Sequence, residues 1–205
     1  MAKLLLKVTF TLLLLSGLVW LARVGIADFL RLAPCTYIEN VESGRERLDP
    51  VQLLVSREQL LSARSWDLSN PLIPEYLGQI AIIQTQLITL SPLLQAKFIH
   101  EAIDYFDIAI ALRPNSAYLW AGRMTAGSML LEINAKSGRD KQFAAQELSM
   151  IATALRHAGE LGPWEPNVLT QMVRVGRLNY AVLSPEARVL VDSAVARAGK
   201  LTLTI

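Results

Sequence analysis

The feature that most limits how this chain can fold is an uncharged apolar run near its start, Val8–Ala22, which follows Lys3 and Lys7. Its 15 residues are fewer than the roughly 20 that a helix needs to cross about 30 Å of hydrocarbon. The span lengthens if the leucines before Lys7 join it, with Lys7 and Arg23 extending their charges to the membrane surface. We therefore predict that residues 1–26 are an uncleaved single-pass membrane anchor.

A cleaved signal peptide is the alternative, because a basic start and a short apolar run also fit one. The residues after the run, Val24–Ala27, make a poor A-x-A cleavage site, and Pro34 before Cys35 does not fit a lipoprotein. The two lysines favour a cytoplasmic N-terminus. In a bacterium this predicts a protein of the inner membrane with its C-terminal domain in the periplasm.

Charge and composition exclude several classes of function. Lys and Arg number 20 against 18 Asp and Glu, and Lys3 and Lys7 account for the whole excess. A chain this balanced is not expected to bind nucleic acid, which needs a clustered basic surface. One cysteine and two histidines leave little for a disulfide framework, a metal site or histidine-based catalysis. We expect no cofactor and no metal.

The rest of the chain predicts helix after helix, with Ser, Asp and Pro at the starts and Gly or Pro near the ends. The expected helices cover about 50–65, 74–89, 92–113, 117–134 and 141–161, and two more open at 167 and 185, the last ending near 199. The predicted fold is all-α, with a transmembrane helix followed by stacked helical hairpins of irregular repeat length. Residues 27–48 are a linker or irregular cap, 49–199 one helical domain, and 200–205 a tail.

One motif points to a particular kind of helical stacking. Its residues, at the spacing of the second helix of a repeat and the start of the next, are Ala102, Phe106, Ala109, Pro114 and Trp120. Small alanines permit close helix approach, the phenylalanine fills the space between repeats, and the proline ends the helix. The stretch resembles the tetratricopeptide family, loosely over 49–199, which implies stacked hairpins that bind protein partners. An irregular bundle is the alternative.

Catalytic motifs are incomplete. His100-Glu101 begins like a metalloprotease H-E-x-x-H motif, but Asp104 stands where the second histidine belongs. Asp104 and Asp107 lie three residues apart on an expected helix, where a solvated face is the simpler interpretation than general acid and base catalysis.

The repeat phase instead predicts a partner-binding surface on the first helices of the hairpins. The candidate residues are Tyr118, Thr125, Ser128, Asn167, Thr170, Arg174 and Arg177. Arg174 and Arg177 share one helix face, so they can pair with carboxylates of a peptide or an anionic glycan.

The resulting hypothesis is a non-catalytic, membrane-anchored scaffold that binds a protein partner in the bacterial envelope. Its layout resembles the VpsP-type polysaccharide biosynthesis proteins, which implies a role beside the export or polymerisation machinery of a surface polysaccharide. An accessory subunit of secretion or cytochrome assembly fits the same layout. The alternative class is a glycan-processing enzyme that uses Glu101, Asp104 or Asp107.

Overall fold

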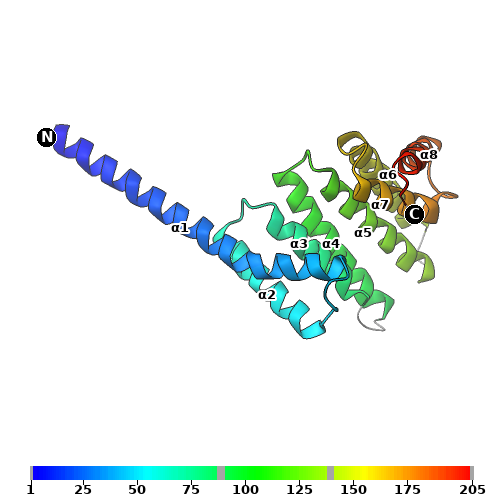
Figure 1. Cartoon of the computed structure of the whole chain (residues 1–205), viewed down its shortest axis with the longest axis horizontal. Coiled ribbons are helices and arrows are strands. Elements are labelled where there is room, and N and C mark those ends of the chain that lie inside the picture. Colours follow the sequence, from blue (N-terminus) through cyan, green and yellow to red (C-terminus); the bar gives the residue numbers. More distant parts are fainter. Residues whose placement is uncertain (1, 87–90, 138–140, 204–205) are drawn as a thin grey trace. The chain divides into compact units, whose positions relative to one another are not determined.

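A computed structural model describes residues 2–86, 91–137 and 141–203, and these fold into helices without a strand. Along the chain (Figure 1) they are α1 Ala2–Glu42, α2 Pro50–Trp66, α3 Leu72–Gln84, α4 Pro92–Leu112, α5 Ala117–Lys136, α6 Lys141–Leu161, α7 Pro166–Asn179 and α8 Pro185–Lys200. The all-α prediction is confirmed for the described residues. Part of the helix expected at 74–89, residues 87–89, lies outside them.

Local capping explains where three of these helices begin. Asp49, Ser91 and Ser184 each accept a hydrogen bond from a backbone N–H two or three residues further on, and a proline follows each of them. The capping side chain satisfies a donor that has no partner within the helix, and proline at the first helical position loses no hydrogen bond. These starts are the ones that the sequence predicts.

The chain divides into two units, residues 1–73 and 74–205, and each is described by itself. In the first unit the second half of α1 packs against α2. The apolar side chains buried there are Ala27, Cys35, Tyr37 and Ile38 of α1 and Leu53, Leu60 and Ala63 of α2. The first half of α1 extends beyond the end of α2 (Figure 1).

The linker or irregular cap expected at 27–48 is mostly helix, because α1 continues unbroken to Glu42. It passes through Pro34, which removes one backbone hydrogen bond and usually ends or kinks a helix. Pro34 is buried in the first unit, and packing against α2 offsets the lost bond. The unit boundary also groups α2 with α1, whereas the sequence placed that helix at the start of the 49–199 domain.

The first half of α1 is apolar and exposed. No residue from 3 to 22 is buried, and Leu13 and Trp20 are 65% and 63% exposed. The helix is long and apolar enough to cross a membrane. At 1.5 Å per residue its 41 residues span about 60 Å, roughly twice the thickness of the hydrocarbon layer.

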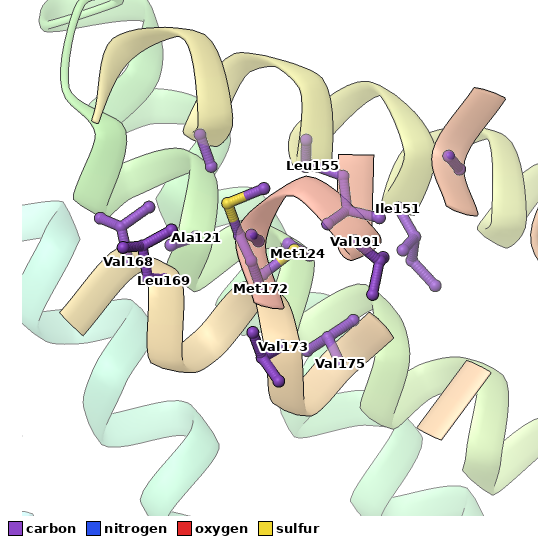
Figure 2. Close-up of a cluster of buried hydrophobic side chains, with 14 of the residues drawn as sticks. Ala121, Met124, Ile151, Leu155, Val168, Leu169, Met172, Val173, Val175 and Val191 are labelled. Carbon is purple, nitrogen blue, oxygen red and sulfur yellow. The ribbon is translucent and has the colours of Figure 1, made fainter. Parts of the chain in front are cut away.

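In the second unit, each helix from α4 to α7 contacts the next helix, and α5 and α6 also contact the one after it. One apolar cluster gathers side chains from α5, α6, α7 and α8, with Met172 among Met124, Leu155 and Val191 (Figure 2). A second cluster joins α3, α4 and α5.

Phe106 occupies the space between three helices of the second cluster. Its ring, 2% exposed, lies against Gly78 of α3 and Gly122 of α5. A Cβ built on Gly78 would lie 3.1 Å from the ring, and one on Gly122 only 2.6 Å from it. Glycine at both positions therefore lets the helices approach closely enough to enclose the ring.

A matched pair of glycine substitutions tests this close packing. Gly176→Ala in α7 would push a Cβ into the buried side chain of Val191, and we expect a loss of about 1–3 kcal/mol in the free energy of unfolding. Gly199→Ala in α8 meets nothing within 4 Å, and we expect it to gain up to about 1 kcal/mol through helix propensity. Chemical unfolding of the detergent-solubilised chain, followed by circular dichroism, measures both. Equal effects would contradict the α7–α8 packing.

Candidate partner-binding face

Helix α7 has one buried side and one open side. Its buried residues are Val168, Leu169, Met172, Val173, Val175, Gly176 and Asn179, and the first five of them belong to the apolar cluster of Figure 2. The candidate residues 167, 170, 174 and 177 recur every three or four positions, so they lie on one face of the helix. Three of them are exposed, and the fourth is half-buried.

This open face of α7 combines two guanidinium groups with two small polar side chains. Arg174 and Arg177 are both exposed and lie three residues apart, as neighbours on the helix surface. Asn167 is exposed near the helix start, and the Thr170 hydroxyl donates to the carbonyl oxygen of Pro166 over 2.9 Å. Two adjacent arginines can bind carboxylates or other anionic oxygens through charge-assisted hydrogen bonds. We call these four residues the α7 face.

Thr125 and Ser128 of α5 are predicted on the same binding surface. In the structure they are instead buried where α5 contacts α7. The Thr125 hydroxyl lies 3.0 Å from its acceptor Ala121 O and 3.1 Å from Gln171 Oε1. Asn179 Nδ2 donates to Ser128 Oγ over 2.7 Å. This is a correction to the sequence prediction, and its physical reason is that α7 packs over this side of α5.

Tyr118, the remaining candidate, lies at the start of α5 and is 44% exposed. Its hydroxyl donates to Glu165 Oε2 over 2.6 Å, and Glu165 directly precedes α7. The hydrogen bond to the carboxylate, with smaller contributions from desolvation and charge repulsion, raises the pKa of the Tyr118 phenol. Tyr118 therefore links the starts of α5 and α7 and also borders the solvent.

Sequence reasoning missed three residues that join α5 to α7: Glu165, Gln171 and Asn179. Gln171 and Asn179 lie 46 and 51 residues beyond the side chains they bind. The sequence carries no sign of which α5 residue each would meet, because that depends on how the two helices are offset. Glu165 was detectable only as a possible N-cap before Pro166, and its side chain makes no capping bond.

The acidic side chains and histidine considered for catalysis lie on α4. Asp104 and His100 are exposed, and Asp107 is paired with Arg123 of α5. Glu75 lies on α3 and is not among these candidates. Burial raises the pKa of its carboxyl, while Arg113, whose Nη2 lies 2.6 Å from Glu75 Oε2, opposes that shift. Asp104 and Asp107 are both exposed, so these two do not meet in a buried cleft.

Within the described part of the chain, no group of three or more His, Cys, Asp or Glu side chains is placed to hold a metal ion. A shallow hollow follows the first turns of α4 and is lined by Ser91, Leu93, Leu94, Ala96, Lys97 and His100. Half of these side chains are apolar, and all six residues belong to α4 or to its N-cap.

No protein-family model matches this chain, and a search of curated proteins finds no similar sequence.

The contact between Tyr118 and Glu165 gives a pH prediction. Because the carboxylate stabilises the protonated phenol, we expect Tyr118 to titrate above the ordinary tyrosine value of about 10. The hydrogen bond then persists until the pH rises through that raised pKa. Glu165→Gln removes the negative charge and lowers the pKa of Tyr118 toward its ordinary value. NMR titration of the tyrosine ring carbons measures it, with Tyr118→Phe for assignment.

Tyr180 provides the internal control for this titration. Its hydroxyl lies 3.0 Å from Asp192 Oδ2, and that hydrogen bond raises its pKa in the same way. Glu165→Gln should leave Tyr180 unchanged, whereas Asp192→Asn should lower its pKa. An unchanged Tyr118 pKa in Glu165→Gln would contradict the placement of Glu165.

Proposed function

We propose that this chain is a non-catalytic, membrane-anchored scaffold that binds a protein partner through the α7 face. The single observation that carries this proposal is that α7 holds Arg174 and Arg177 together on an exposed surface, while its other side is packed into the second unit. The proposal has three parts: the anchor, the helical stack and the chemistry of its partner.

Support for the anchor comes from the exposed apolar half of α1. Between residues 4 and 21 the helix carries large apolar side chains on every side, and no residue in this range is buried. A surface this apolar is unfavourable in water and fits a lipid environment. A helix also satisfies its own backbone hydrogen bonds, which hydrocarbon requires.

Support for the stack comes from the contacts between consecutive helices from α4 to α8, from those of α5 with α7 and of α6 with α8, and from the apolar cluster that joins α3, α4 and α5. This is the pattern expected if α3–α4, α5–α6 and α7–α8 are successive helical hairpins, as in the tetratricopeptide family. Phe106 between Gly78 and Gly122 fits the role of the motif phenylalanine. In this arrangement α3, α5 and α7 are the first helices of the hairpins, the position from which helical repeats bind their partners.

The chemistry of the α7 face favours an acidic partner. Arginine binds carboxylates in a planar, bidentate geometry, so two neighbouring arginines suit a segment with closely spaced Asp or Glu residues. Asn167 and Thr170 add uncharged polar groups that can bind a peptide backbone. An acidic segment of a partner protein is therefore the ligand class that we propose.

The biological setting that we propose is an envelope complex of a bacterium. The protein would lie in the inner membrane with its C-terminal domain in the periplasm, because Lys3 and Lys7 favour a cytoplasmic N-terminus. The resemblance in layout to VpsP-type proteins favours exopolysaccharide biosynthesis or export. Secretion and cytochrome assembly are the other systems in which such an accessory subunit fits.

A glycan-processing enzyme is the alternative function. Hydrolysis of a glycoside normally uses two carboxyl groups that flank the bond, one of them with a raised pKa. Asp107 is paired with Arg123, and Asp104 is exposed, so this pair offers no such arrangement. Incubation of the purified chain with cell-surface glycans tests the alternative directly, and cleavage by the isolated protein would overturn the scaffold proposal.

The anchor gives the next prediction. Leu12→Arg with Leu15→Arg places two charges in the apolar run, each unfavourable by about 2.5–3.5 kcal/mol at a membrane centre. We expect the wild type to resist alkaline extraction from native membranes and the double variant to be extracted. Phe29→Arg with Leu32→Arg, at exposed positions beyond the run, is the matched control and should stay in the membrane.

Intact mass spectrometry of the membrane-bound protein accompanies this extraction. Retention of residues 1–26 is the expected result, and their loss would support the cleaved signal peptide. Extraction of the wild type itself would contradict the anchor.

The α7 face gives a separate prediction. Arg174→Glu with Arg177→Glu reverses both charges, so an acidic partner should be repelled and its co-purification from detergent-solubilised native membranes lost. The matched control is Lys136→Glu with Arg156→Glu, at exposed positions on α5 and α6. Quantitative mass spectrometry of the recovered proteins measures the difference.

The identity of the recovered proteins distinguishes the envelope systems. Glycosyltransferase, polymerase or export subunits that bind the wild type and the control, but not the α7 variant, support the exopolysaccharide role. Secretion or cytochrome-assembly proteins with the same dependence keep the scaffold and change the pathway. A set of partners that the α7 variant retains would contradict the α7 face.

A further inference from the structure

Two sets of hydrogen bonds hold α2 against α1, one at each end of α2. At its start, Asp49 N donates to the Tyr37 hydroxyl over 2.8 Å, and that hydroxyl donates to Asp49 O over 3.1 Å. At its end, Arg23 Nε donates to the carbonyl oxygen of Trp66 over 3.2 Å. The two helices are therefore antiparallel, and α2 ends level with Arg23.

Arg23 marks the end of the apolar half of α1, because it is the first charged residue after the run. If α1 crosses a bilayer as proposed above, its guanidinium group lies at the level of the lipid headgroups. The hydrogen bond from Arg23 then places the Trp66 backbone at that level too.

The segment that follows, Trp66–Asn70, is held there at both of its ends. Asn70 Nδ2 donates to Asp28 Oδ1 over 3.3 Å, and the same carboxylate oxygen accepts from Arg31 Nε over 2.7 Å. Within the segment, the Ser69 backbone N–H donates to Asp67 Oδ1 over 2.9 Å. We call Trp66–Asn70 the interfacial loop.

Two large apolar side chains of this loop are exposed. Trp66 is 40% exposed, and Leu68 is 69% exposed. Tryptophan is enriched where a membrane meets water, since its ring is apolar and its N–H can bind a polar group. Moving a leucine side chain at the same level from water into the upper acyl chains is favourable, by roughly 1.5–3 kcal/mol of transfer free energy on full burial.

From these contacts we infer that the interfacial loop docks on the lipid surface, with Trp66 and Leu68 inserted among the headgroups and upper acyl chains. The occupant is lipid because the bond between Arg23 and Trp66 brings two exposed apolar side chains to the level at which the exposed apolar run of α1 ends. The inference rests on the proposed anchor. It gives α2 a fixed height, with its first residue about 25 Å above the membrane surface when the hairpin stands upright.

Site-specific fluorophores on single cysteines test the docking in the full-length chain. In a Cys35→Ala background, which removes the one native cysteine, an environment-sensitive label is attached through Leu68→Cys. Phe10→Cys labels the apolar half of α1, and Glu46→Cys labels the turn between α1 and α2 as the matched control. The proteins are reconstituted in vesicles of phosphatidylethanolamine and phosphatidylglycerol that contain lipids with a nitroxide near the headgroup or deep in the acyl chain.

The expected result is a blue shift and quenching by the shallow nitroxide for the label at position 68, and neither for the label at 46. The label at position 10 should be quenched by the deep nitroxide. A label at 68 that behaves like the one at 46, while the one at 10 is quenched, overturns the docking and leaves the anchor intact. Absence of quenching at position 10 overturns the proposed anchor and the docking together.

A second measurement keeps the native cysteine, since Cys35 is buried and its replacement can disturb the hairpin. Intrinsic tryptophan emission of the wild type is quenched with the same shallow nitroxide lipids. Trp66→Phe should lower the amount of emission that these lipids quench, and an unchanged amount of quenched emission would overturn the docking.

Discussion

Close contact between helices at small residues is the constraint on which the second unit depends. Phe106 fits between α3, α4 and α5 because Gly78 and Gly122 have no side chain to exclude its ring. Val191 of α8 fits against α7 because Gly176 faces it. Each such contact fixes the distance and offset of two helices, and the offsets together decide which side of α7 remains open. The α7 face is therefore a consequence of packing at residues that themselves bind nothing.

Helix α1 meets two environments along its length. Its second half is buried against α2, while its first half has no protein cover and is apolar on every side. Because one continuous helix joins the two halves, the proposed anchor would set the orientation of the whole α1–α2 hairpin relative to the bilayer. In that case the hydrogen bond from Arg23 to Trp66, and the one that Asp28 accepts from Asn70, would hold the end of α2 at the membrane surface. A flexible linker after residue 26 would have fixed neither the height nor the direction of α2.

The candidate binding residues divide by their packing. Thr125 and Ser128 are of the same small, polar kind as Thr170, and their repeat phase is equivalent, yet they are buried beneath α7. Arg174 and Arg177 stay exposed. Helical phase alone thus placed four of the seven candidates on one face of α7. It also placed Tyr118 at the exposed start of α5, and it failed for Thr125 and Ser128. The failure has a definite cause, since phase says which side of a helix a residue occupies and not whether another helix covers that side.

The sequence by itself determined most of the helices after residue 49 and the starts of three of them, because capping and proline effects involve only a few neighbouring residues. Asp49, Ser91 and Ser184 begin their helices as predicted. It also determined that the first half of α1 is apolar. Only the tertiary structure decided that α1 continues through Pro34 and that α7 covers one side of α5. Both outcomes depend on packing between segments that are distant in the chain, and no local pattern encodes how those segments are offset. One example is the hydrogen bond between the buried Ser128 and Asn179, which lie 51 residues apart.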